Sequence, residues 1–555
     1  MRTISATILS FIASTALAQT PVLVKDINPG SFSGIYTTSN AAVADNTLYF
    51  SAVDSLHGEE LWKTDGTEAG TVLAKDINPD TASCQPKFYA VYNGQVYFTA
   101  KKAGLGTELW RTDEIEGAIL AGGDICPGLC SGAVYSSSVG LFAEYNGNLI
   151  FQLNRELWKS DGTPSGTTLL KDINPGTSAY GYPFGFVEFQ GKLYFSADSA
   201  NTGTEMWITD GTDSGTHLFK DINPDVWGNS VSGQPAVGTD AFYFWAKNNT
   251  SNGAELWKSD GTPQGTVQLK DIRAGIDGGQ PSYFGYIPMS NSVWLGDKLL
   301  FSADDGDIGP ELWITDGTEA GTQILFDIRT GVSGSNIQFL TAVNGKAYFR
   351  AGSSSGQELW VSDGTVAGTH LIKDINPGTA GSINPYVAVN YAVYEDKIYF
   401  TANDGTTGAE LWVTDGTEVG TKLVFDLNPG AEASTPTNCQ VMGDFLYFFA
   451  TTQANGTELW KLSLKTSPTS TLENQLAIKV YPTLSTEGIF YFNSNGENTE
   501  FLDVQVFDAL GRLVQITSQS PDQALQLSSL PTGAYFIRIA TTDGKFTTQK
   551  VIIGR

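Results

Sequence analysis

Short hydrophobic runs alternate with polar turns along most of the chain. In one unit, Tyr92-Asn93-Gly94 is typical of a hairpin turn, Gln95–Thr99 of a strand, and Glu108-Leu109-Trp110 of the next strand. Each unit also predicts a further strand like Thr71–Ile77. The density of Gly, Thr, Asp and β-branched residues argues against a helical solenoid, so the pattern predicts an all-β chain.

The Glu-Leu-Trp tripeptide recurs nine times, with Met206 in place of Leu in one copy. Its tryptophans are Trp62, Trp110, Trp158, Trp207, Trp257, Trp313, Trp360, Trp412 and Trp460. From Trp62 to Trp460 is 398 residues over eight intervals, a mean period just under 50 residues, which is typical of a four-stranded propeller blade. We therefore expect a large β-propeller of about nine four-stranded blades.

The ends of the array predict a closed ring. The ninth copy stops at Trp460-Lys461-Leu462 and lacks its last strand, whereas Val22–Ile27 is such a strand without the rest of its unit. Pairing these fragments would close the ring and leave no unpaired edge. Nine blades exceed the usual four to eight, so the exact number is left open.

The repeat Glu-Leu-Trp-x-x-Asp-Gly-Thr, as in Glu60–Thr67, resembles that of a family of exported bacterial proteins, the ELWxxDGT-repeat proteins. The resemblance covers most of the chain. It implies an exported, propeller-like protein and no particular activity.

Residues 1–18 are predicted to be a signal peptide. Arg2 precedes a short apolar run that ends in Ala16-Leu17-Ala18, the small-x-small pattern of a cleavage site. The run is too short to span a bilayer, so no transmembrane segment is expected. The predicted propeller occupies residues 19–462, and residues 463–474 read as a linker rich in Ser, Thr and Pro.

Residues 475–555 predict a β-sandwich, because short alternating strands are separated by turn residues. The pieces Val480-Tyr481-Pro482, Val506–Val514 and Leu530–Ile537 resemble the C-terminal sorting domain (type A) of the bacterial type IX secretion system. Thr483-Leu484 stands where that family usually has Asn-Pro. The resemblance implies the type IX secretion machinery as a partner and a secreted or outer-membrane surface location.

The motif itself is expected to hold the blades together. In an antiparallel hairpin, Trp62 would lie opposite Leu73 and Glu60 opposite Lys75, forming a charge pair. The Asp of each Asp-Gly-Thr turn, such as Asp65, can bond its own backbone. Each turn offers only one or two carboxylates, so we predict no metal site and no cofactor, with calcium as the alternative.

Functional residues are expected in the crossovers, the connections from the fourth strand of one unit to the first strand of the next. Each crossover begins with an Asp such as Asp26, which is expected to cap the turn. Beyond that Asp the crossovers differ, and function concentrates in variable loops on a regular scaffold. The candidate ligand-binding residues are Tyr180, Tyr182, Phe184, Trp227, Tyr283, Phe284 and Tyr286. Aromatic rings beside Asp and Asn suit sugar binding; the alternative is that they pack the loops onto the blades.

The charge excludes one class of partner. The chain has 32 Lys and Arg against 59 Asp and Glu, a net charge of -27, and nucleic-acid affinity comes largely from basic residues. With 41% hydrophobic and 12% aromatic residues, the chain has the composition of a folded protein. We therefore expect an acidic folded surface that binds no nucleic acid.

Catalysis has little support in the sequence. The chain has no Gly-x-Ser-x-Gly, no His-Glu-x-x-His and no phosphate-binding glycine loop, and no catalytic residue is assigned. The three histidines are His57, His217 and His370, and the last two share one place in the repeat. The four cysteines are Cys84, Cys126, Cys130 and Cys439, and three pairings are open to them.

Two functions of different class follow. The first is a secreted or cell-surface binding or adhesion propeller for glycans or proteins, expected to be a monomer. The alternative is an extracellular polysaccharide hydrolase or lyase that uses a carboxylate pair. A structural component of a surface layer or matrix is a third hypothesis.

Overall fold

The computed structural model divides the chain into two units, Gln19–Lys465 and a second that includes Thr466–Arg555. It describes residues 20–36, 41–125, 142–176, 181–224, 230–249, 253–275, 277–281, 291–383, 391–465, 479–481, 484–493, 501–508, 513–517, 524–541 and 546–554. The predicted signal peptide, residues 1–18, lies outside these ranges. Within them no helix has the length and apolar character needed to cross a membrane.

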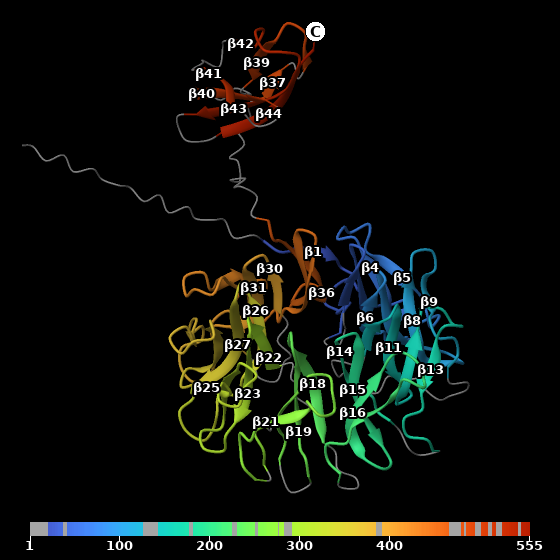
Figure 1. Cartoon of the computed structure of the whole chain (residues 1–555). Helices are drawn as coiled ribbons and strands as arrows, with labels where there is room; N and C mark the ends of the chain where they lie inside the picture. Colours follow the sequence, from blue (N-terminus) through green and yellow to red (C-terminus); the bar gives the residue numbers. More distant parts are fainter. Residues whose placement is uncertain are drawn as a thin grey trace, which may run out of the picture. The chain divides into compact units, whose positions relative to one another are not determined.

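Nine four-stranded antiparallel sheets form the first unit and are arranged as blades around a ring (Figure 1). Blades 1 to 3 are β2 (Ala41–Ala44), β3 (Thr47–Asp54), β4 (Gly58–Thr64) and β5 (Val72–Lys75); β6 (Lys87–Tyr92), β7 (Gln95–Lys102), β8 (Gly106–Asp113) and β9 (Gly117–Leu120); and β10 (Phe142–Tyr145), β11 (Asn148–Leu153), β12 (Glu156–Ser160) and β13 (Thr168–Lys171). Blades 4 to 6 are β14 (Phe184–Phe189), β15 (Lys192–Ser199), β16 (Gly203–Thr209) and β17 (His217–Lys220); β18 (Val231–Val237), β19 (Phe242–Ala246), β20 (Glu255–Ser259) and β21 (Val267–Lys270); and β22 (Ser292–Leu295), β23 (Lys298–Asp304), β24 (Pro310–Thr315) and β25 (Gln323–Phe326). Blades 7 to 9 are β26 (Gln338–Val343), β27 (Lys346–Ser353), β28 (Gly356–Ser362) and β29 (His370–Leu371); β30 (Tyr391–Tyr394), β31 (Lys397–Asn403), β32 (Ala409–Thr414) and β33 (Lys422–Phe425); and β34 (Thr437–Met442), β35 (Phe445–Thr452), β36 (Gly456–Ser463) and β1 (Val22–Lys25).

The N-terminal strand closes the ring, as predicted. β1 pairs with β36 in blade 9, with Leu23 opposite Trp460 and Lys25 opposite Leu459. The first strands of neighbouring blades line the inside of the ring, and β2 of blade 1 contacts β34 of blade 9. In Figure 1 the orange strands of blade 9 accordingly lie beside the blue strands of blade 1. The ring therefore has nine blades and no open seam.

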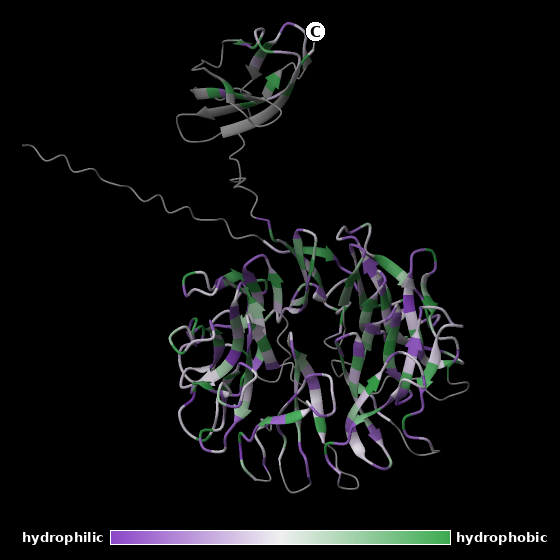
Figure 2. Ribbon diagram, in the orientation of Figure 1, coloured by the Kyte–Doolittle hydropathy of each residue, from purple (hydrophilic) through white to green (hydrophobic). Residues whose placement is uncertain are grey.

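Apolar cores lie between neighbouring blades. At the seam, Trp62 and Phe50 of blade 1 pack with Leu459 and Phe449 of blade 9 and with Val24 of β1. Hydrophobic and hydrophilic residues alternate along many strands in Figure 2, because successive side chains of a strand point to opposite faces. The motif tryptophan is thus a core residue that joins two blades.

The Asp-Gly-Thr turn docks onto the preceding blade. In blade 1, Asp65 Oδ1 accepts hydrogen bonds from the backbone N–H of Thr67 (2.8 Å) and its hydroxyl (2.7 Å). Gly66 has φ +91°, and its carbonyl accepts a 2.7 Å hydrogen bond from Lys461 Nζ of blade 9. Equivalent hydrogen bonds, from a basic side chain of one blade to the turn glycine carbonyl of the next, join Arg111 to Gly162, Lys159 to Gly211 and Lys258 to Gly317.

The predicted pair of Glu60 and Lys75 is wrong. Trp62 does lie opposite Leu73, but a β-bulge shifts the register, so Lys75 lies opposite Leu61. The lysine instead reaches the next blade, where its Nζ lies 3.3 Å from Glu116. At the seam, Lys25 Nζ likewise donates to the Thr71 carbonyl (2.8 Å). These lysines therefore connect blades, and Glu60 has other partners, described below.

Replacing Gly66 with Ala is expected to lower the free energy of unfolding by about 2–5 kcal/mol. Positive φ costs a non-glycine residue roughly 1–2 kcal/mol, and the new Cβ would overlap the Tyr447 hydroxyl of blade 9, an overpacking that costs about 1–3 kcal/mol. Gly30→Ala is the matched control, because Gly30 has φ +102° but open space around its Cβ position. All 12 tryptophans lie between residues 62 and 460, so denaturation followed by tryptophan fluorescence reports on the ring alone. Equal losses in both variants would contradict the docking role of the turn.

The second unit has the two sheets of a β-sandwich. One sheet has the order β37 (Lys479–Tyr481), β39 (Ile489–Asn493) and β42 (Leu525–Gln526). The other has the order β38 (Leu484–Ser485), β44 (Phe546–Ile553), β43 (Gly533–Thr541), β40 (Phe501–Asp508) and β41 (Leu513–Thr517). Val480, Phe490, Val506 and Ile537 belong to one buried core. β36 extends to Ser463, so the first residue of the predicted linker belongs to the last strand of the ring.

Candidate functional site

The motif glutamate anchors the crossover that leaves its own blade. Glu60 is fully buried and accepts hydrogen bonds from the backbone N–H groups of Ile77 (2.7 Å) and Cys84 (3.0 Å). The corresponding backbone donors in the other blades are Ile125 to Glu108, Ile173 and Gly181 to Glu156, Ile222 to Glu205, Ile272 and Gly279 to Glu255, Ile328 to Glu311, Ile375 to Glu358, Leu427 and Ser434 to Glu410, and Gly34 to Glu458. In every blade, therefore, backbone N–H groups of the crossover are held by the carboxylate of the motif glutamate.

Burial changes the acidity of these glutamates. It raises the pKa of six of them to about 7, because the charged carboxylate loses its hydration. These six are Glu60, Glu205, Glu255, Glu311, Glu358 and Glu458. The turn carboxylates shift the other way, since hydrogen bonds from Thr67 lower the pKa of Asp65.

The stability of the ring is expected to peak between about pH 4 and 5. Above the ordinary glutamate pKa of 4.5 the folded state retains protons that the unfolded chain releases, so stability falls as the pH rises through about 7. Below the ordinary aspartate pKa of 3.8 the turns lose their contribution as Asp65 and its counterparts are protonated. Urea denaturation followed by tryptophan fluorescence from about pH 3 to 9 measures this profile. Stability that rises between pH 5 and 8 would contradict the assignment.

Crossovers and the loops between second and third strands share one face, as predicted. Gly58, at the start of β4, lies so close to the Thr81 carbonyl and the Ser83 hydroxyl that a Cβ there would crowd both. Arg273 of the crossover leaving blade 5 pairs with Asp304 of blade 6 (2.6 Å). This face of the ring, which we call the crossover face, collects the most variable segments of the repeat.

Two of the predicted ligand-binding residues are described by the structure. Tyr182 is 39% exposed, and the Arg155 guanidinium lies 5.4 Å from its ring centroid. Phe184 begins β14 and packs against the core between blades 2 and 3. The other candidates, Tyr180, Trp227, Tyr283, Phe284 and Tyr286, lie outside the described residues. Tyr182 thus has a partly exposed ring beside Arg155, whereas Phe184 is partly buried by packing.

The positive φ of Tyr182 has a structural origin. Its φ is 42°, and similar values occur at Gln85, Asn336 and Thr435 in other crossovers. Each of these residues directly follows the crossover position that corresponds to Cys84, whose N–H donates to the motif glutamate. The positive φ is therefore a property of the anchored loop. The backbone of Tyr182 is therefore no evidence for a ligand.

The sequence reasoning missed two aromatic residues in the first crossover. Phe32 is 70% exposed and Tyr36 is 48% exposed. Both line an open hollow of about 380 Å³ between this crossover and the ends of β3 and β36, together with Asn28, Ser33, Val53 and Thr457. The signal was present in the sequence, because these residues follow Asp26 as other variable segments follow their own crossover Asp. We call this hollow the seam hollow.

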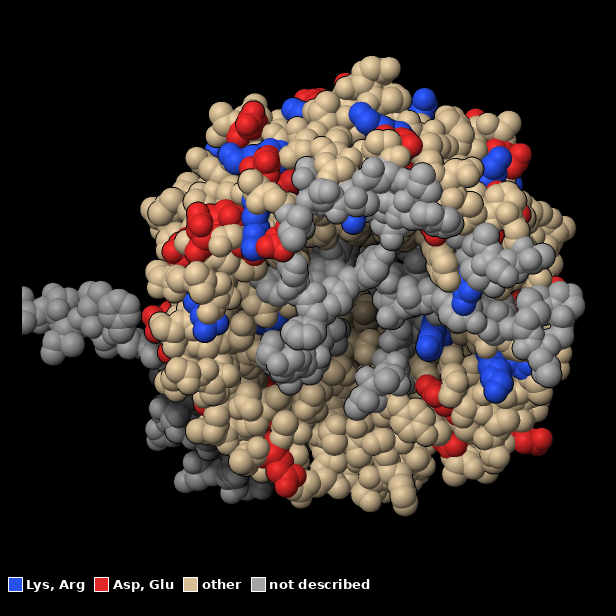
Figure 3. All heavy atoms as spheres, turned by 90° about the horizontal axis from the view of Figure 1, so that it is seen from below, with Lys and Arg blue, Asp and Glu red and all other residues tan. Residues whose placement is uncertain are grey.

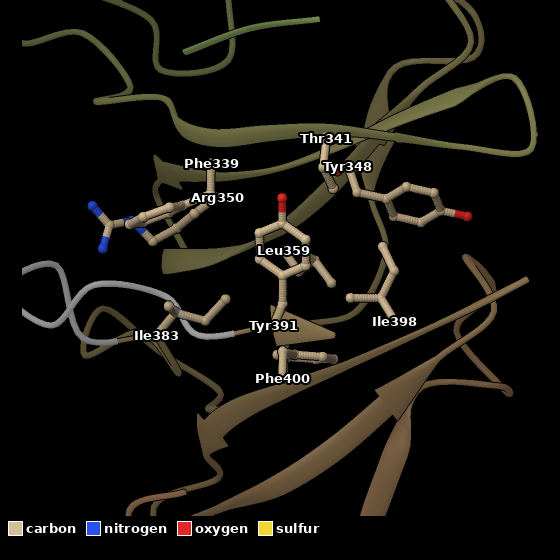
Figure 4. A pocket seen from close by; sticks show the side chains of 9 residues that line it. All are labelled: Phe339, Thr341, Tyr348, Arg350, Leu359, Ile383, Tyr391, Ile398 and Phe400. Atoms are coloured by element: carbon tan, nitrogen blue, oxygen red, sulfur yellow. The ribbon is translucent and has the colours of Figure 1, made fainter. Parts of the chain in front are cut away.

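A second cavity lies inside the ring wall, between blades 7 and 8. Its volume of about 20 Å³ is close to the minimum for one water molecule. Figure 4 shows Leu359, Tyr391 and Phe400 around it, with the guanidinium of Arg350 directed away from its centre. That guanidinium lies 5.2 Å from the Phe339 ring centroid and donates to Gln338. The cavity is an apolar packing gap and too small for a substrate.

The titratable residues form no evident reaction centre among the residues described. His57 Nδ1 pairs with Asp54 (2.8 Å) in a loop of the crossover face, whereas His217 and His370 are exposed at the starts of β17 and β29. Within those ranges no three His, Cys, Asp or Glu side chains are grouped so that they could hold a metal ion. Cys84 and Cys439 are free and buried, and Cys126 and Cys130 lie outside the described residues.

The crossover aspartates act partly as turn caps. Asp426 Oδ2 accepts from the backbone N–H of Gly430 (3.3 Å), and Asp26 Oδ2 makes a longer contact of 3.5 Å with Gly30. Asp26 also accepts from Asn455 Nδ2 of blade 9 (3.2 Å). Acidic and basic side chains are interspersed around the ring in Figure 3, so the net charge of -27 is not gathered in one patch of that view.

Comparison with known proteins identifies the C-terminal part. Residues 479–554 match the model of the secretion system C-terminal sorting domain, which confirms the predicted type IX sorting domain. The protein is therefore secreted or displayed at the cell surface. A search of curated proteins gave no match. The resemblance of the repeat to ELWxxDGT-repeat proteins stays a prediction.

The similarities to solved structures are distant. A puromycin hydrolase is similar at 15% identity with a TM-score of 0.37, over 67% of this chain and 60% of that chain. A puromycin-hydrolyzing peptidase of Mycobacterium tuberculosis is similar at 12% identity with a TM-score of 0.36, over 66% of this chain and 59% of that chain. The chain thus spans about 60% of the length of the first of these structures. Similarity this low supports no transfer of activity.

Proposed function

We propose that this protein is a secreted or cell-surface binding propeller that attaches to glycans or proteins through its crossover face. The observation that carries the proposal is the glutamate anchor. Each blade fixes its crossover with a buried or half-buried carboxylate, as Glu60 does through Ile77 and Cys84, while the rest of the crossover differs between blades. A regular scaffold that holds variable loops in place is a common arrangement for recognition.

The chemistry of the described loops supports binding. Tyr182 offers an exposed ring held by Arg155, and Phe32 and Tyr36 offer two more in the first crossover. Large exposed aromatic side chains beside polar groups are typical of recognition surfaces, because one side chain supplies apolar area and, in tyrosine, a hydroxyl. The sorting domain places such a surface outside the cell, where glycans and other surface proteins occur.

The proposal is tested with the full secreted chain on a glycan array and on a panel of extracellular proteins, with calcium and with a chelator. We expect specific binding to at least one class, and its loss on heating as the tryptophan signal shows the ring unfolding. Calcium dependence would show that the cation contributes to the site. Absence of any binding, together with release of products from a polysaccharide panel, would favour the hydrolase or lyase instead.

A further inference from the structure

We infer that the seam hollow is a binding site for a neutral saccharide, with Phe32 and Tyr36 packing against a sugar ring. The inference rests on the proposed binding function and assigns it a ligand class and a place. It concerns the crossover from blade 9 to blade 1, which also closes the ring.

The loop that carries the two aromatic residues is held at several points. Gly34 donates its N–H to Glu458 (2.8 Å), and its carbonyl accepts from the Val53 N–H (2.7 Å). Asn28 Nδ2 donates to the Ser33 carbonyl (3.3 Å), and Ile35 is buried to 1% exposure. A loop fixed in this way pays little ordering entropy when a ligand binds.

Phe32 and Tyr36 nevertheless remain outside the core. They lie on either side of Ser33–Ile35, in which Gly34 and Ile35 are buried, and are themselves exposed by 70% and 48%. Burial of Phe32 against its own blade would stabilise the ring by removing a large apolar side chain from water, and the loop does not obtain that gain. The residues at the place of Phe32 in five other described crossovers are Ala82, Asp277, Ser333, Ala380 and Glu432. An exposed aromatic residue is therefore no requirement of the crossover fold.

Polar groups surround the aromatic pair. Ser33 Oγ accepts a hydrogen bond from the Thr457 N–H (3.0 Å), which leaves the serine hydroxyl proton to donate. The Asn28 side chain contributes an amide oxygen as an acceptor. A pyranose presents hydroxyls at its edge and apolar C–H groups on its face, so it matches hydrogen-bonding groups beside exposed rings.

The charge and the size of the seam hollow limit the class of ligand that it can bind. No charged residue lines the hollow among the residues described, and the whole chain carries a net charge of -27, which disfavours anionic polysaccharides. A volume of about 380 Å³ lies at the low end of ligand pockets, about 300–1,000 Å³, and suits one or two sugar rings. A protein partner would need about 800 Å² of surface on each side, far more than this hollow offers.

The test compares four full-length chains on arrays of neutral glycans: wild type, Phe32→Ala/Tyr36→Ala, Phe32→Trp and Leu56→Ala. Leu56 is the matched control, because it is 70% exposed in the β3–β4 loop of blade 1 but does not line the hollow. We expect the double variant to lose at least roughly tenfold in affinity, since truncating central aromatic contacts commonly costs more than 1 kcal/mol. Phe32→Trp and Leu56→Ala should bind as wild type does, and all four should unfold at similar urea concentrations.

The outcomes separate this inference from the proposed function. Wild-type affinity in the double variant would overturn the seam hollow as the site and leave the binding function in place. Binding to proteins but to no neutral glycan would overturn the saccharide assignment alone. Binding to neither class would overturn both.

Discussion

Deleting residues 20–27 is expected to open the ring and to lower its stability by about 5 kcal/mol or more. The deletion removes β1, the outer strand of blade 9, and exposes the edge of β36. It also removes Val24 and Ile27, which are buried at 4% and 5% exposure and are worth about 1.5–3 kcal/mol each. Because proteins are stable by only about 5–15 kcal/mol, the blade 9 to blade 1 seam should unfold under mild conditions.

Urea denaturation and light scattering measure the effect, with a matched pair of substitutions as the control. Val24→Asp places a charge in the seam core and should reproduce much of the loss, whereas Val22→Asp, at a position 54% exposed in the same strand, should change little. A deleted chain that stays monomeric and unfolds at the wild-type urea concentration would show that the ring does not depend on β1.

The period and the ends of the array were sufficient to predict the ring. Trp62 to Trp460 set the blade length, and the incomplete unit at Trp460-Lys461-Leu462 predicted the pairing with Val22–Ile27 that β1 and β36 make. The blade length and the closing strand pair could be predicted because both depend on the repeat period and on an incomplete unit, which can be read directly from the sequence. The sandwich of the sorting domain was predicted from strand-length runs for the same reason.

The partners of the motif glutamate could not be predicted from the pattern. The β-bulge beside Leu61 moves Lys75 by one place, and a one-residue shift reassigns the cross-strand pairs beyond the bulge. The true partners of Glu60 are backbone N–H groups, which every residue except proline carries, so the residue types gave no sign of them. Phe32 and Tyr36 were missed for a different reason. Their crossover precedes the first complete repeat, and this part of the sequence was interpreted only as the strand that closes the ring.

The buried anchoring role of the motif glutamate and the exposed aromatic residues of the crossovers together explain how the repeat separates stability from recognition. Glutamate, tryptophan and the Asp-Gly-Thr turn are used within or between blades, as Glu60, Trp62 and Gly66 of blade 1 show. The crossover residues that carry no such role are free to differ. Substitutions in the motif should therefore act through stability, and substitutions at exposed crossover positions through binding.

Replacing Glu458 with Ala is expected to destabilise the ring by at least about 3 kcal/mol and to weaken binding at the seam hollow. The change leaves the buried N–H of Gly34 without its 2.8 Å partner, which costs about 1–3 kcal/mol. It also opens a cavity where a fully buried side chain stood, and large-to-small core substitutions cost about 2–5 kcal/mol. Since Gly34 lies between Phe32 and Tyr36, the loop that presents both rings loses its main tether.

Glu458→Gln distinguishes the anchor from a general packing role. Glutamine keeps an acceptor for Gly34 and has nearly the same volume, so stability at pH 5 should stay within about 1 kcal/mol of wild type. Because glutamine does not ionise, the variant should also lose less stability than wild type between pH 5 and 8, where the Glu458 pKa of about 7 makes the native carboxylate costly. Urea denaturation at the two pH values measures both effects. If Glu458→Gln is as unstable as Glu458→Ala at pH 5, the hydrogen-bonded anchor is not what holds the crossover.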